Sequence, residues 1–183
     1  MRTVARSAAL IAFSVACGYA KLVLFPFLFF VEIFSVAVFL SGAILGAGWG
    51  AWIGAVSRLV FSVANPYGPP HPWVLAAQVA GAAVVGALGG AVGRRLLPWG
   101  APGAGEAARI ATLAIAGVAG TAAYDLLTNV AQGWVFGSVP AALALAAIPS
   151  AQHVASNGVI FAVIGRLALP WLGRDPRIAG DAA

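Results

Sequence analysis

Ionisable and amide side chains stand out in this sequence because they interrupt long apolar runs. A charged or strongly polar group inside hydrocarbon costs roughly 3 kcal/mol or more, so each is by default a candidate functional group. Asp125 and Asn129 are four residues apart, as are His153 and Asn157, which places each pair on one face of a helix. Carboxylate, imidazole and amide groups that converge in this way can bind and orient a polar small molecule.

Further polar and aromatic residues fall at the same predicted depth. The complete predicted substrate-binding set is Glu32, Arg58, Asn65, Tyr67, His71, Trp73, Gln78, Asp125, Asn129, His153 and Asn157. Plainer roles stay open for some of them: Arg58 and Asp125 could form a structural ion pair, and His153 could be a core histidine bonded to a carbonyl. His71 and His153 lack a recognisable ligand spacing, so no metal site or cofactor is predicted.

The elements that must position these residues are membrane-spanning helices. Of 183 residues, 62% are hydrophobic and 8% are charged, whereas soluble domains are about half apolar and a quarter charged. Because a span needs roughly 20 apolar residues, we predict an all-α bundle of six transmembrane helices as a single domain over 1–172. Residues 173–183 are predicted to be a disordered cytoplasmic tail. The predicted spans are Val4–Leu24, Phe27–Leu45, Trp49–Ala64, Trp73–Leu97, Ala107–Val135 and Ser150–Leu169.

Two segments allow other interpretations. The apolar run Ala141–Ala147 is too short to cross a bilayer, which predicts a re-entrant or interfacial piece between the last two spans. The first span could instead be a signal peptide, since Arg2 and Arg6 precede it and Cys17 lies in a sequence like a lipoprotein cleavage site. The apolar run continues past that site, which favours a span.

The basic residues predict the orientation in the membrane. Cytoplasmic loops are rich in Lys and Arg, and with both termini in the cytoplasm only Lys21 lies on the outer side. The Pro-rich segment 65–73 then faces outward, and all the polar candidates fall in the outer half of the bundle. This arrangement predicts a binding cavity open to the outside, because a pore or proton relay needs polar residues through the full thickness. We expect a multi-pass protein of a bacterial or archaeal plasma membrane.

Composition also excludes several classes of protein. The 10 basic residues lie between apolar runs and form no surface stripe, which excludes nucleic-acid binding. A single cysteine, Cys17, excludes a disulfide framework and a thiolate metal site. The sequence has no G-x-x-x-x-G-K-[ST] motif, so energy for any transport must come from a partner. We therefore predict no enzymatic activity in this chain.

Small residues form a stripe on the cytoplasmic half of the first span. The stripe consists of Ala5, Ala8, Ala9, Ala12 and Ala16. Residues three and four apart share a helix face, and small side chains let another helix approach closely. The neighbour could be another helix of the same bundle or a helix of a partner protein.

The chain resembles the substrate-binding S component of an energy-coupling factor (ECF) transporter. The resemblance covers nearly the whole chain and is carried by the six short spans, the Ala8-x-x-x-Ala12 pattern and the arginine-rich inner loops. The segments from Phe61 to Pro69 and from Tyr124 to Asn129 add to it. Its motifs are loose, since members of this family share shape more than sequence.

The resemblance implies a function for both regions. S components bind a vitamin or related micronutrient near the outer surface, under the loops after the first and third spans. The alanine stripe would dock on a transmembrane T component, to which two ATPase subunits bind. The expected cargo is a corrinoid such as cobalamin, because the rim is rich in Trp, Tyr and His, and otherwise a flavin, pterin or pyrimidine vitamin.

Other classes of function make different demands on the sequence. A six-helix scaffold of cell-envelope assembly is the main alternative, but its polar residues should be scattered along helix interfaces. An intramembrane enzyme could use Asp125 and His153 as acid and base, yet no nucleophile is placed beside them. A secondary transporter should show internal repeats, and no half-to-half correspondence is evident.

Overall fold

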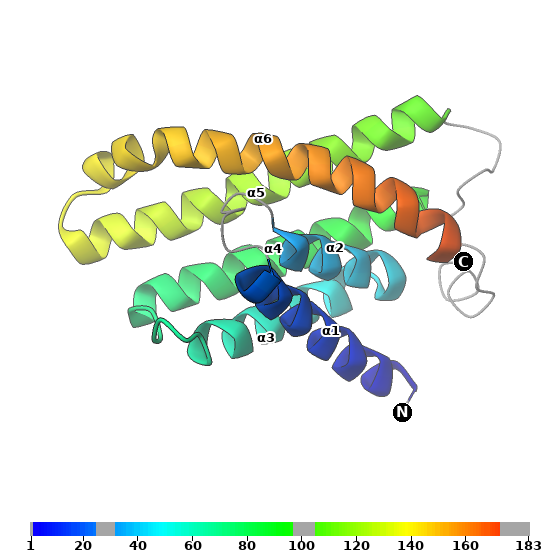
Figure 1. Cartoon of the computed structure of the whole chain (residues 1–183), viewed down its shortest axis with the longest axis horizontal. Coiled ribbons are helices and arrows are strands. Elements are labelled where there is room, and N and C mark those ends of the chain that lie inside the picture. Colours follow the sequence, from blue (N-terminus) through cyan, green and yellow to red (C-terminus); the bar gives the residue numbers. More distant parts are fainter. Residues whose placement is uncertain (1, 25–31, 97–104, 173–183) are drawn as a thin grey trace.

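The computed structural model describes residues 2–24, 32–96 and 105–172, and these segments are almost entirely helical (Figure 1). The helices are α1 (Arg2–Leu24), α2 (Ile33–Leu45), α3 (Ala47–Val63), α4 (Pro72–Leu96), α5 (Glu106–Phe136) and α6 (Val139–Leu172). Four of them, α1, α4, α5 and α6, are long and apolar enough to cross a membrane. The all-α prediction is therefore confirmed for the described residues, and the architecture is that of a helical membrane bundle.

The two remaining helices are shorter. α2 has 13 residues and α3 has 17, and Gly46 joins them with φ of 90°. That left-handed backbone suits glycine, which has no Cβ. The first residues of the predicted second span, 27–31, and the predicted tail, 173–183, lie outside the described residues.

α5 and α6 form a long antiparallel hairpin (Figure 1). Gly137, with φ of 89°, ends α5 in a left-handed conformation, and α6 begins two residues later. The prediction of a separate piece over Ala141–Ala147 and a span starting at Ser150 was wrong, because α6 runs continuously through Pro149. Proline is tolerated inside membrane helices where neighbouring groups satisfy the freed backbone carbonyl.

Glycines hold α2, α3 and α4 together. The residues of the glycine seam are in close contact with the backbone of a neighbouring helix or of the α2–α3 connection; they are Gly42, Gly50, Gly54, Gly86 and Gly90. A Cβ added at Gly86 would lie 1.9 Å from the carbonyl oxygen of Gly50, so these backbones approach as closely as glycine alone permits.

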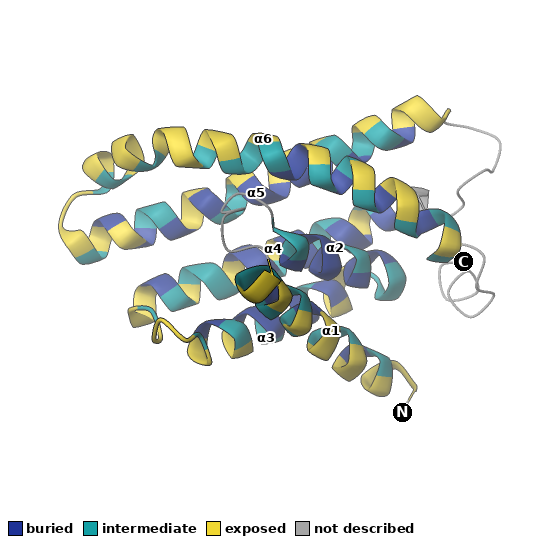
Figure 2. Ribbon diagram, in the orientation of Figure 1, coloured by how far each residue is buried: buried dark blue, intermediate teal, exposed yellow. Residues whose placement is uncertain are grey.

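Large side chains fill the space between helices α2–α4 and the α5–α6 hairpin. Phe39 of α2 meets Phe161 of α6 edge to face, with ring centroids 5.2 Å apart. Both rings are almost completely buried, as Figure 2 shows for the middle of the bundle. α1 covers α3 and runs parallel to it: Gly18 packs against Phe61, and the Tyr19 hydroxyl donates to the carbonyl of Ala64. The helices alternate in direction, so α1 begins and α6 ends at the same end of the bundle (Figure 1).

Candidate functional site

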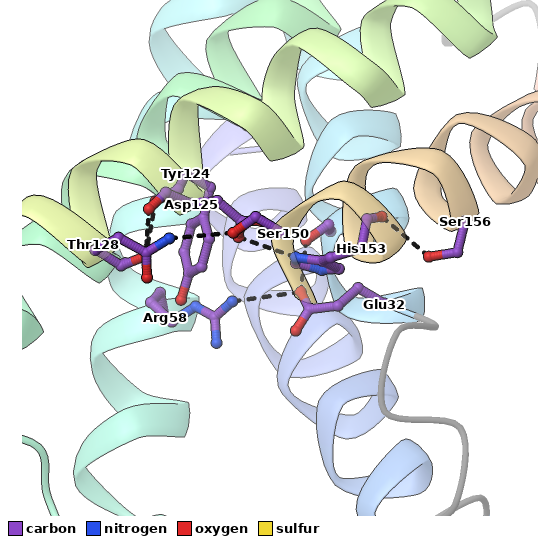
Figure 3. A network of polar contacts seen from close by, with 10 residues as sticks. Glu32, Arg58, Tyr124, Asp125, Thr128, Ser150, His153 and Ser156 are labelled. Carbon is purple, nitrogen blue, oxygen red and sulfur yellow. Dashed lines mark hydrogen bonds and ion pairs between the residues drawn. The ribbon is translucent and has the colours of Figure 1, made fainter. Parts of the chain in front are cut away.

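An ion pair and a histidine–carboxylate hydrogen bond lie side by side at the centre of the bundle (Figure 3). Glu32 occupies the N-cap position of α2 and Arg58 the last third of α3, and their side chains are 3.4 Å apart. The hydroxyl of Ser35 donates to the same carboxylate oxygen of Glu32 at 2.7 Å. Both side chains are largely shielded from solvent, so the carboxylate is held by a cation and a hydroxyl.

Aromatic rings enclose the guanidinium of Arg58. Its carbon lies 4.5 Å from the centroid of Phe34 and 4.7 Å from that of Tyr124, which comes from α5. Cation–π contacts of this kind stabilise a desolvated cation. The open possibility of an Arg58–Asp125 ion pair was wrong, since Arg58 pairs with Glu32 and Asp125 has another partner.

The histidine–carboxylate hydrogen bond joins the two helices of the hairpin. Nδ1 of His153 lies 2.9 Å from Oδ1 of Asp125, so the alternative of a histidine bonded to a carbonyl was also wrong. One turn further along α5, the amide of Asn129 donates to the hydroxyl of Ser150 at 3.1 Å. Because a carboxylate oxygen accepts, Nδ1 of His153 carries a proton, and the contact fixes the orientation of the ring.

These polar groups form the floor of an open groove of about 760 Å³ that extends to the α5–α6 turn. Its polar lining residues are Glu32, Asp125, Asn129, Gln132, Ser138, Ser150 and His153. Its apolar lining residues are Phe136, Ala141, Ala142, Leu145, Ala146 and Pro149. The volume lies within the range of roughly 300–1,000 Å³ that small-molecule sites occupy. We call this space the hairpin groove.

A second, much smaller cavity lies behind Glu32. It measures about 100 Å³ and is lined by residues of α1, α2 and α3, including Lys21, Arg58 and Asn65. Glu32 lines both this cavity and the hairpin groove. Glu32 therefore lies between the two spaces, with Arg58 on the side of the smaller cavity.

The structure brings together five of the predicted site residues and separates the rest. Glu32, Arg58, Asp125, Asn129 and His153 form the cluster described above.

Gln78 accepts a hydrogen bond from Ser62 at the α3–α4 contact. Asn157 is completely buried one turn beyond His153, with no hydrogen-bond partner for its amide among the described residues. Neither residue lines the hairpin groove.

Of the predicted lid residues, Asn65 reaches the small cavity behind Glu32, whereas Tyr67, His71 and Trp73 do not line either space beside the cluster. Asn65 stabilises the turn after α3 by accepting from the backbone of Tyr67, whose side chain is exposed to solvent. His71 and Trp73 line another surface groove of about 730 Å³ together with Trp134. An aromatic rim is therefore present, but it borders a different groove from the charged cluster.

Sequence reasoning missed one wall of the hairpin groove. Gln132 on α5 was not predicted as a site residue, and Ser138, Leu145 and Pro149 were missed because the start of α6 was assigned to a separate segment between the last two spans. The available signal was the spacing of Ser138, Ala142, Leu145 and Pro149, which are four, three and four residues apart and therefore share one helical face.

The alanine stripe lies on the outside of the bundle (Figure 2). All five alanines are exposed, while Ser7, Ser14 and Gly18 of α1 face the other helices. Within the described part of the chain, the stripe is not used for packing against α2 or α3. It is an open, smooth helix surface.

No protein-family model, no curated protein and no solved structure matches this chain. Among the described residues there is also no group of three or more His, Cys, Asp and Glu side chains that could hold a metal ion. The case for a function depends on the hairpin groove and the exposed stripe.

Proposed function

We propose that this protein is the membrane-embedded, substrate-binding S component of an ECF transporter. It captures a vitamin or related micronutrient at the outer face of a bacterial or archaeal plasma membrane. A T component and two ATPase subunits then drive uptake. In this proposal all six helices lie in the membrane, both termini are cytoplasmic, and the α5–α6 turn faces outward.

The observation that carries the proposal is the hairpin groove. It joins a cluster of four ionisable side chains at the centre of the bundle to the surface at one end. Burying such groups among apolar helices is costly unless they pair or serve a ligand. In a scaffold, polar residues should instead be spread along the helix contacts, so the convergence favours a binding protein.

The exposed alanine stripe supports the need for a partner. A row of small side chains on an outer helix surface gives a partner helix close backbone approach, and the described helices of this chain leave the row uncovered. The stripe lies on the half of α1 nearest the chain termini, which is the end opposite the α5–α6 turn. Binding and docking are thus assigned to opposite ends of the bundle.

The test separates docking from binding. Ala12→Trp places a large side chain on the exposed stripe, and we expect it to abolish cellular uptake while ligand affinity stays unchanged. Phe13→Trp is the matched control, since Phe13 is 56% exposed on the same helix but lies off the stripe. Uptake that survives Ala12→Trp, or ligand affinity that falls together with uptake, would contradict the docking role.

A further inference from the structure

Acidic side chains outnumber basic ones on the hairpin groove. Its lining includes the carboxylates of Glu32 and Asp125 and the imidazole of His153, but no Lys or Arg among the described residues. The charge of Glu32 is matched from behind by Arg58, whose buried guanidinium is turned toward the rings of Phe34 and Tyr124. What remains to face a ligand is therefore the pair of Asp125 and His153.

One of the two carboxylate oxygens of Asp125 is available to accept a hydrogen bond from a ligand. Oδ1 accepts from His153, whereas no described residue donates a hydrogen bond to Oδ2. The side chain is 12% exposed, and Asp125 lines the groove. A mostly desolvated carboxylate with a vacant acceptor position favours a ligand that brings a positive charge and a donor, because charge-assisted hydrogen bonds are about twice as strong as neutral ones.

The remaining polar and apolar residues that line the groove also restrict which ligand can bind. The amides of Asn129 and Gln132 can accept or donate hydrogen bonds. Ala141, Ala142 and Ala146 provide a smooth wall from α6, which suits the face of a flat ring. An anionic ligand would meet two carboxylates here and no Lys or Arg side chain among the residues that line the groove.

From this geometry we infer that the hairpin groove selects a flat heteroaromatic ligand with a single positive charge and at least one N–H donor, bound through Asp125. This inference rests on the proposed function and narrows its cargo. Among the vitamin classes considered, it favours a cationic ring system over a corrinoid, and it disfavours carboxylate-bearing vitamins.

The test is a thermal-shift and binding series with probes of one shape and different charge. The probes are 1-methylnicotinamide as the cation, nicotinamide as the neutral ring and nicotinate as the anion, with thiamine, riboflavin and biotin as larger cationic, neutral and anionic probes. We expect the cation of each series to stabilise the protein most. Asp125→Asn should weaken cation binding about 10- to 100-fold, the effect of losing one charged hydrogen bond, and leave neutral probes unaffected.

Glu106→Gln is the matched control, since it removes the same charge from an exposed carboxylate that pairs with Arg166 at the far end of the hairpin. It should leave cation binding unchanged. Stabilisation by riboflavin, biotin, nicotinamide or nicotinate without a response to the cations would overturn the charge inference and leave the proposed binding function standing. No response to any vitamin would overturn both.

Discussion

Substitution of Gly86 by alanine should destabilise the bundle because it forces apart two backbones in the glycine seam. The added Cβ would lie 1.9 Å from the carbonyl oxygen of Gly50, whereas an ordinary contact is 3.4 Å or more. α3 and α4 would have to separate by about 1.5 Å. Overpacking of this kind costs roughly 1–3 kcal/mol or more, and the better helix propensity of alanine returns only about 1 kcal/mol.

Thermal unfolding of the purified protein in detergent measures the effect. For a chain of this size, each kcal/mol corresponds to about 2–4 °C in Tm, so a net loss of about 1–2 kcal/mol should lower Tm by roughly 2–8 °C. Gly48→Ala is the matched control, because Gly48 is in α3, two residues before Gly50, and an added Cβ there meets no atom within 4 Å. A Gly86→Ala protein as stable as the Gly48→Ala protein would refute the close approach of α3 and α4.

The remaining predictions concern the charged cluster. Glu32→Gln should lower the free energy of unfolding by about 3 kcal/mol, because Arg58 is left buried without its counter-charge. Adding Arg58→Met should recover most of this loss in the same thermal assay. A double variant no more stable than Glu32→Gln would exclude the pairing of Glu32 with Arg58. Asn129→Ala should weaken binding of the ligand found in the probe series and, because it also removes the hydrogen bond to Ser150, lower Tm of the unliganded protein by only about 2–4 °C. Unchanged affinity in a titration of that variant would remove this part of α5 from the site.

Sequence reasoning found the depth of the polar residues but could not assign their partners. Distance from a helix end can be read along the chain, and because successive helices alternate in direction, Glu32, Arg58, Asp125 and His153 were expected at one level. Which of them pair depends on how each helix is rotated about its axis and which helices are neighbours. The carboxylate for Arg58 comes from the short helix α2, a choice that hydropathy does not encode.

The start of α6 and the side-chain directions of the Pro-rich segment after α3 could not be predicted from the sequence either. Pro149 interrupts a pattern that otherwise predicts one helix, and proline alone does not reveal whether the neighbouring helices satisfy the broken backbone contact. The Pro-rich segment after α3 has no periodicity from which a side-chain direction follows. Its aromatic residues were therefore assigned to the charged site, whereas His71 and Trp73 border a separate groove.

The central claim is that the hairpin groove opens at the outer face of the membrane, and cysteine labelling tests it directly. Cys17 is the only cysteine, so a Cys17→Ser background allows single cysteines to be read without interference. Gln132→Cys places a thiol on an exposed position of the groove, and Gly48→Cys places one near the opposite end.

A membrane-impermeant maleimide should label Gln132→Cys in intact cells, and a bound ligand should slow the reaction. Gly48→Cys should react only in inverted vesicles. Labelling of Gln132→Cys only in inverted vesicles would place the groove on the cytoplasmic side and contradict capture of a substrate from outside.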